Sequence, residues 1–420
     1  MPTPKRVEFR YLDGLRGGAA LLVAAYHAYL FTGRTGDAEA AMPLWKEVIG
    51  LGYVGVPVFI VLSGYVLMLP VTRTRDLTFR GGVGAFIKRR ARRILPPYYA
   101  AMAFALLLIA IVPVMQQPTG TAWDSKLPVT LESVVAHLLL LHNLSPHQMF
   151  TINGPLWSVA LEWQIYFVMS FALLPLWRRL PSTLVVGALL VVTMIPVALQ
   201  TGTFAHPWLV ALFAVGMLAA QLTLSNSEQR WAGPTTITLA LAIIPAAALP
   251  RLFDVPADPF VEVIAGLAVA SALIWAGRRT LSSGTPRAAV PFQSRPMMFL
   301  GLISYSIYLF HSPILGLFNL LLLPLQIPTV MLYMLVTFVG LPLAVGVAYL
   351  MFWLIERHFL NSHQRHAAQE ISSSADRGVK HGSHLLGSRE ISLRLDALPG
   401  ETHRTVQREQ EPGAPRAWRR

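Results

Sequence analysis

The first hydrophobic segment of the chain carries an arginine and a histidine whose spacing suits chemistry inside a membrane. In the stretch YLDGLRGGAALLVAAYHAYLF, Arg16 precedes His27 by eleven residues. An α-helix turns about 100° per residue, so the two side chains lie within about 20° of each other and about 16 Å apart along the axis. Ionisable residues in membrane helices mostly face the bundle interior or a water-filled path. We therefore expect both groups to face one cavity.

A carboxylate in a later hydrophobic segment is predicted to lie near this histidine. Counted from the same membrane surface, His27 lies about 9 Å deep and Glu162 about 10 Å deep. Two such groups at equal depth could act as a general base and the carboxylate that orients it or tunes its pKa. The alternative is that His27 is a hydrogen-bonded packing residue and Glu162 an interfacial carboxylate.

The composition is that of a polytopic membrane protein. The chain has 420 residues, of which 54% are hydrophobic and 13% charged, whereas soluble domains carry about 25% charged residues. The net charge of +13 would otherwise suggest nucleic acid, but in a membrane protein excess Lys and Arg mainly reports topology, and no nucleic-acid partner is expected. The absence of cysteine excludes disulfides, Cys-ligated zinc and an acyl-cysteine intermediate. No metal site is predicted.

We predict an all-α membrane bundle of about ten transmembrane helices. The ten apolar segments, each near the ~20 residues that a bilayer crossing needs, are 15–33, 50–70, 95–115, 155–177, 182–200, 206–222, 233–250, 259–277, 298–323 and 328–354. An eleventh segment, 131–143, is too short to cross and is expected to be an interfacial or re-entrant helix.

The distribution of basic residues predicts the orientation of this bundle. If both termini are cytoplasmic, the inner segments hold 19 Lys and Arg and the outer loops hold 4. This bias is the one expected of a protein in the cytoplasmic (inner) membrane with its N-terminus inside. Residues 1–360 then form the membrane-embedded domain. Residues 361–420 are polar and lack a spanning run, so we expect a disordered cytoplasmic tail.

A basic stretch precedes the third predicted span and suits a polyanion. In KRRARRILPPYY, residues 88–99, Arg90 and Arg93 are three apart and share one face of the helix start. Guanidinium groups make forked contacts with phosphates, and a donor such as acyl-coenzyme A would present several phosphates there. The alternative is a topology anchor that touches lipid phosphates.

Three further motifs could line a polar cavity. Ser63 and Gly64 interrupt the second span, where small residues allow close helix packing but also close approach of a ligand to the backbone. In the fourth span, Ser158 and Glu162 share a face of the helix. In the ninth span, Ser304, Tyr308 and His311 form a stripe at helical spacing that ends near the middle of the bilayer. The predicted cavity residues are Trp157, Ser158, Tyr166, Ser304, Tyr308 and His311. The alternative interpretation is that the tryptophans belong to an interfacial belt and that His311 is a structural residue.

Taken in order, these motifs resemble those of the acyltransferase-3 family of integral membrane acyltransferases. The resemblance rests on the Arg16/His27 pair and on VFIVLSGY, RRARRILPPYY, LWSVALEWQIYF, GLISYSIYLFH and IERHFL, from about residue 9 to residue 360. It implies O-acyl transfer, usually of acetyl, from acyl-coenzyme A to a hydroxyl of a sugar, a cell-envelope glycan or a secondary metabolite. It implies that Arg16 and His27 form the family's essential catalytic pair and that Arg90 and Arg93 form the arginine motif associated with the donor. We also expect Glu162 to be catalytic and Ser63, Gly64 and Tyr65 to bind the donor.

The expected mechanism is base-catalysed transfer in the bundle. Donor phosphates would bind at the arginines from the cytoplasm, and His27 would take the proton of the acceptor hydroxyl as it attacks the thioester. In an alternative chemistry, His27 itself carries the acyl group. Two other functions remain open: a transporter that uses the embedded His and Glu as a proton relay, and a binding or sensor protein without turnover. No permanently bound cofactor is expected, and the acceptor and oligomeric state are not predicted.

Overall fold

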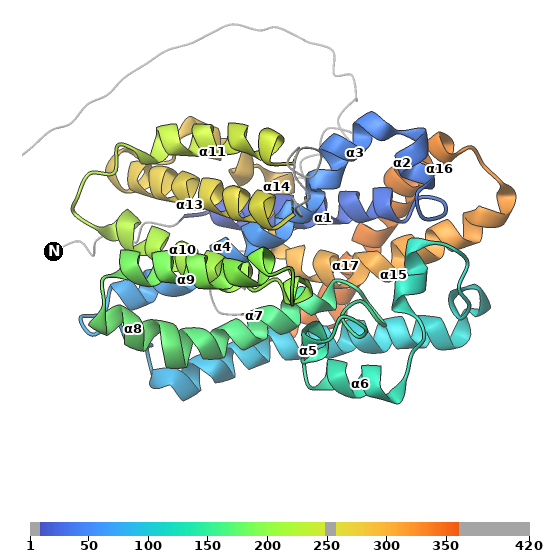
Figure 1. Ribbon diagram of the computed structural model, residues 1–420, viewed down its shortest axis with the longest axis horizontal. Helices are drawn as coiled ribbons and strands as arrows, with labels where there is room; N and C mark the ends of the chain where they lie inside the picture. The colour runs from blue at the N-terminus through green and yellow to red at the C-terminus, as the bar shows by residue number, and fades with distance from the viewer. Residues whose placement is uncertain (1–8, 248–257, 361–420) are drawn as a thin grey trace, which may run out of the picture. The chain divides into compact units, whose positions relative to one another are not determined.

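The chain folds as a bundle of α-helices, as predicted. The computed structural model describes residues 9–247 and 258–360, and no strand occurs within these ranges. The α-helices (Figure 1) are α1 Tyr11–Leu30, α2 Asp37–Ala41, α3 Pro43–Ile49, α4 Gly55–Thr72, α5 Gly82–Ile111, α6 Leu131–Leu138, α7 Leu156–Val168, α8 Leu174–Arg179, α9 Ser182–Ala198, α10 Trp208–Leu224, α11 Ala232–Ala247, α13 Asp258–Ser283, α14 Arg295–Leu302, α15 Ser304–Leu322, α16 Thr329–Leu335 and α17 Leu341–Leu354. The predicted tail, 361–420, lies outside the described residues.

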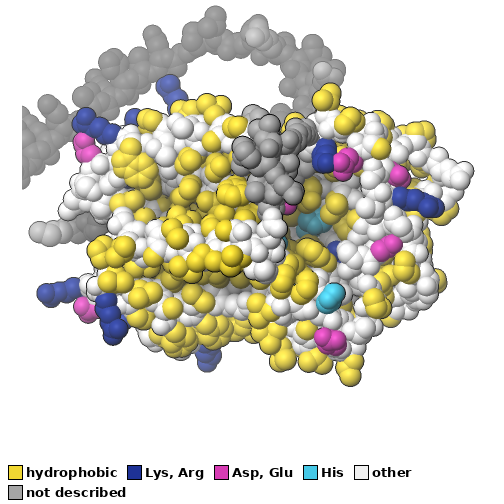
Figure 2. Space-filling model, viewed as in Figure 1, with side chains coloured by type: hydrophobic (Ala, Val, Ile, Leu, Met, Phe, Trp, Pro, Cys, Tyr) yellow, Lys and Arg dark blue, Asp and Glu magenta, His cyan; other side chains and the backbone are white. Residues whose placement is uncertain are grey.

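The predicted hydrophobic segments coincide with helices of this bundle. Seven helical segments in the described ranges are long and apolar enough to cross a membrane, and two shorter apolar helices, α9 and α11, accompany them. Helix α1 occupies the first predicted segment. Figure 2 shows charged side chains gathered toward the two ends of the long helices, with hydrophobic side chains between. This distribution fits a membrane-embedded bundle, while the count of ten crossings stays a prediction.

Two helix boundaries differ from the prediction. Helix α5 begins at Gly82 instead of residue 95, so the basic stretch lies inside the helix. Gly81 and Gly82, with φ of 79° and 80°, end the preceding turn, and the helix then runs without a break through the basic stretch into the apolar run. The segment 298–323 is divided at Ile303 into α14 and α15. The segment 131–143 contains only the short helix α6, as expected.

Helix α1 lies at the centre of the contacts that build the site. It packs against α4, α14 and α15. Its glycines allow this close approach, because a Cβ atom on Gly17 would lie 2.5 Å from the backbone nitrogen of Gly301 in α14. The crossing therefore fixes the rotation of α1, and with it the directions of Arg16 and His27.

A second close crossing joins α4 to α10 and yields a stability prediction. A Cβ atom on Gly64 would lie 2.1 Å from the carbonyl oxygen of Phe213. We expect Gly64→Ala to lower the free energy of unfolding by about 1–3 kcal/mol, the usual cost of overpacking. The matched control is Gly187→Ala in α9, where a Cβ atom meets nothing within 4 Å and alanine favours the helix. Thermal unfolding of both variants in detergent tests this, and equal midpoints would contradict the packing role.

Candidate active site

An elongated cavity runs through the bundle between α1, α4, α5, α7 and α15. Its volume is about 450 Å³. On α4 it extends from Val56 to Arg73, a length of about 25 Å at ~1.5 Å per residue. The polar side chains that line it are Arg10, Asp13, Arg16, Ser63, Arg73, Arg90, Arg93, Ser158, Glu162, Tyr166, Ser304, Tyr305 and Tyr308.

Arginines dominate one end of this cavity. We call it the basic end and define it by Arg10, Arg16, Arg73, Arg90 and Arg93. The sequence interpretation had singled out three of these as site residues and had counted the other two, Arg10 and Arg73, only as topology charges. Two buried nitrogens there, Nε of Arg90 and Nη1 of Arg93, have no hydrogen-bond partner. Unpartnered guanidinium donors of this kind suit an anionic ligand.

Arg93 is also held by a buried carboxylate that the sequence interpretation missed. Its Nη2 lies 2.9 Å from Oε1 of Glu356, and the side chain of Glu356 is fully buried. The second oxygen of Glu356 accepts hydrogen bonds from the backbone N–H (3.1 Å) and the hydroxyl (2.6 Å) of Ser306 in the first turn of α15. Glu356 therefore joins α5 to α15, and a carboxylate at a helix N-terminus is favourable. Glu356 lies in the motif IERHFL, but nothing in the sequence indicated its pairing with Arg93.

Glu162 anchors a hydrogen-bonded cluster on the cavity wall. Its Oε1 accepts hydrogen bonds from Ser63 Oγ and from Tyr166 OH, each at 2.7 Å. One turn earlier on α7, Ser158 Oγ lies 2.6 Å from Tyr308 OH. The cavity thus brings together the predicted residues Ser63, Ser158, Glu162, Tyr166, Ser304 and Tyr308.

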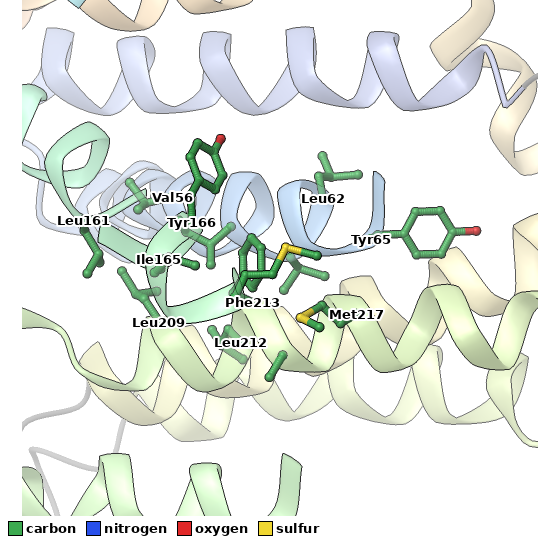
Figure 3. Close-up of a cluster of buried hydrophobic side chains, with 14 of the residues drawn as sticks. Val56, Leu62, Tyr65, Leu161, Ile165, Tyr166, Leu209, Leu212, Phe213 and Met217 are labelled. Carbon is green, nitrogen blue, oxygen red and sulfur yellow. The ribbon is translucent and has the colours of Figure 1, made fainter. Parts of the chain in front are cut away.

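Three predicted site residues point away from the cavity. Gly64 packs against α10, as described above, and Tyr65 is fully buried with its hydroxyl 3.2 Å from Oγ1 of Thr223. Figure 3 shows Tyr65 and Tyr166 pointing in different directions. The ring of Trp157 lies 4.4 Å from that of His206 and does not line the cavity. Successive residues of a helix face different ways, so of Ser63, Gly64 and Tyr65 only Ser63 lines the cavity.

His27 does not line the cavity and lies beside a second histidine. The ring centroids of His27 and His311 are 4.8 Å apart. Each ring directs Nδ1 to the carbonyl oxygen four residues earlier in its own helix, Val23 and Ile307, at 2.9 Å. A carbonyl only accepts hydrogen bonds, so Nδ1 carries the proton of each neutral ring and Nε2 keeps a lone pair. The arrangement provides two ring nitrogens with free lone pairs, one on the fully buried His311 and one on the partly buried His27.

The expected contact between His27 and Glu162 is not formed. Within residues 9–247 and 258–360, no hydrogen bond or ion pair joins them, and the partner beside His27 is His311. The expectation that Arg16 and His27 line one cavity also needs correction, because only Arg16 does. The aromatic rings of Phe59 and Tyr308, 5.6 Å apart, lie at the cavity end nearest His311. Equal depth in a membrane does not fix which way two side chains point around their helices.

Comparison of the sequence with known protein families shows which family the chain belongs to. The family model Acyl_transf_3, described as an acyltransferase domain, matches residues 9–353. The chain belongs to this acyltransferase family. The match covers all the helices that line the cavity and both histidines, which confirms the resemblance found in the sequence motifs.

Individual members of the family are similar to the chain only at low sequence identity. The chain is 30% identical to "Acyltransferase MdmB" of Streptomyces mycarofaciens over 42% of this chain and 41% of that protein. It is 23% identical to "Peptidoglycan O-acetyltransferase OatA" of Listeria monocytogenes over 73% of this chain and 49% of that protein. The chain thus spans less than half the length of either relative. No solved structure matches it.

Proposed function

We propose that the chain is a membrane O-acyltransferase that moves an acyl group, acetyl in the first instance, from acyl-coenzyme A to a hydroxyl. The observation that carries this proposal is the shape and charge of the cavity. It is long and narrow, with five arginines at one end and a hydroxyl-rich wall toward the other. A nucleotide-tipped thioester has the matching form, with phosphates at one end of a thin arm.

The chemistry follows from the positions of these groups. The donor phosphates bind at the basic end, and the pantetheine arm lies along α4 past Ser63 and Glu162. The thioester passes Phe59 and Tyr308 and reaches the histidine pair. Nε2 of His27 takes the proton of the acceptor hydroxyl as its oxygen attacks the thioester carbonyl carbon. The C–S bond then breaks, and the thiolate takes the proton back from His27.

The orientation and the acceptor are part of the same proposal. The bias of 19 to 4 basic residues supports a basic end that faces the cytoplasm, where acyl-coenzyme A is available, in an inner-membrane protein with both termini inside. The acceptor approaches from the opposite end. The name of one relative, a peptidoglycan O-acetyltransferase, supports a sugar of an envelope glycan as the acceptor, and a secondary metabolite is the alternative that the sequence motifs imply.

Turnover by the purified chain tests the activity. Full-length protein in lipid nanodiscs is mixed with labelled acetyl-coenzyme A and soluble peptidoglycan fragments, and ester-linked label is separated from free thiol. We expect labelled ester that is released by mild base. Uptake of acceptor into vesicles without any consumption of acetyl-coenzyme A would instead favour the transporter and would exclude this proposal.

Donor binding can be measured without an acceptor. We expect Arg90→Ala to raise the Kd for desulfo-coenzyme A about 10- to 100-fold, because a hydrogen bond to a charged group contributes about 1.5–3 kcal/mol. The control is Arg92→Ala, which removes an exposed arginine of the same helix that does not line the cavity. Arg93 is a less clean test because it pairs with Glu356. Equal Kd values for the two variants would rule out donor binding at Arg90.

A further inference from the structure

A buried lysine stands outside the seven apolar helical segments and has no role in the mechanism above. Lys126 ends the short helical turn Ala122–Lys126 between α5 and α6, and only 7% of it is exposed. Its Nζ donates to Ser125 Oγ at 2.9 Å and lies 5.5 Å from the centroid of the Phe150 ring. No carboxylate of the described residues forms an ion pair with it.

A buried ammonium group without an ion-pair partner lowers the stability of the folded state. Lysine is almost never fully buried unless it is paired, and desolvation of an unpaired charge opposes folding. Burial lowers the pKa of Lys126 to about 7. Strongly perturbed groups of this kind concentrate at functional sites.

The segment around this lysine is joined to α15, the helix that carries His311. Lys126 is a charged neighbour of His27 and His311. Gly154 makes room for the ammonium group, since a Cβ atom there would lie 2.7 Å from Nζ. The neighbouring Asn153 donates from Nδ2 to the carbonyl oxygen of Leu309 at 2.9 Å, which fixes the segment to α15 two residues before His311.

Unpartnered polar atoms accumulate at the same place. Nε2 of His311 and Oδ1 of Asn153 are buried and have no hydrogen-bond partner. A buried polar group without a partner is unfavourable. Segment 153–154 therefore links the lysine to α15 near the histidine pair, and a polar ligand group there would give these unpartnered atoms a partner.

We propose that Lys126 is a catalytic residue of the transfer and that its ammonium group stabilises the oxyanion. The inference rests on the proposed function. As the acceptor oxygen bonds to the thioester carbon, the C=O electron pair moves to the carbonyl oxygen, and Lys126 donates a hydrogen bond to it. When the C=O bond re-forms, the C–S bond breaks and Lys126 keeps its proton. A donor aimed at this oxygen acts on the transition state more than on the bound substrate.

The first test removes the charge and keeps the length of the side chain. In the nanodisc assay with acetyl-coenzyme A and peptidoglycan fragments, we expect Lys126→Met to lower kcat about 10²–10³-fold, the usual effect of losing one oxyanion donor. The Kd for desulfo-coenzyme A should stay within about twofold, because Lys126 is remote from the phosphates. The matched control is Lys46→Met, which removes an exposed lysine paired with Glu39 and should leave kcat unchanged.

The outcomes separate this inference from the proposed function. Turnover by the wild type and by Lys46→Met establishes the transfer itself, whatever Lys126 does. A kcat for Lys126→Met equal to that of the control would overturn the role of Lys126 alone. Absence of ester product from every form, the wild type included, would overturn the proposed function and this inference with it.

A second variant keeps the proposal falsifiable if Lys126→Met does not fold. The ammonium form of Lys126 is present below a pH of about 7 and is lost above it, so kcat of the wild type should fall as the pH rises through that range. Lys126→Arg keeps a charge that does not titrate and should retain activity without this fall. The other titratable groups that face the lysine are His27 and His311, and Asp124 of the same turn is bonded to the backbone of Thr119 and Gly120. The same alkaline fall in Lys126→Arg would contradict the proposal.

Discussion

Replacing His27 with glutamine should lower kcat about 10²–10⁴-fold, the contribution typical of a positioned general base. The glutamine amide can still donate to the carbonyl oxygen that now accepts from Nδ1 of His27, but it cannot take a proton from a hydroxyl. Folding and the Kd for desulfo-coenzyme A should be close to those of the wild type. Ester formation at saturating donor in nanodiscs measures the effect.

The control for this experiment is His147→Gln, because His147 is an exposed histidine of the loop before α7. It should turn over like the wild type. A folded His27→Gln variant with ordinary kcat would exclude His27 both as the base and as an acyl carrier.

The second large effect concerns stability. We expect Glu356→Ala to lower the free energy of unfolding by about 3–5 kcal/mol, because it leaves the guanidinium of Arg93 buried without its counter-charge. The backbone N–H of Ser306 would lose its acceptor as well. Unfolding in detergent, followed by tryptophan fluorescence, provides the measurement.

Two comparisons separate the buried ion pair from a general effect of losing a carboxylate. Glu39→Ala breaks an exposed pair with Lys46 and should change the stability by less than about 1 kcal/mol. In a double-mutant cycle, adding Arg93→Met to Glu356→Ala should restore part of the loss, since the stranded charge is gone. Similar losses for Glu39→Ala and Glu356→Ala would refute the account of this ion pair.

The positions of the helices could be predicted from the sequence because they depend on local composition. Runs of about 20 apolar residues must form helices in a membrane, and within the described ranges each predicted segment falls on helix, although 298–323 is divided at Ile303. The same reasoning selected Arg16, Arg90 and Arg93, because cations next to an apolar run are visible within one segment of sequence.

The partners of these residues could not be predicted, because they depend on how the helices rotate against one another. Depth placed Glu162 level with His27, but the close packing of α1 against α14 and α4 turns His27 toward His311. Glu356 reaches Arg93 from 263 residues further along the chain. Lys126 lies in a connecting segment, where no helical periodicity indicates which way a side chain points.

The most direct test of the central claim is a cryo-electron microscopy structure of the full chain with a non-hydrolysable thioether analogue of acetyl-coenzyme A. The account predicts phosphate density against Arg16 and Arg90, the arm along α4, and the carbonyl oxygen between His27 and Lys126. A nucleotide bound outside the cavity, or a ring of His27 that faces lipid and stays closed off from the ligand, would contradict it.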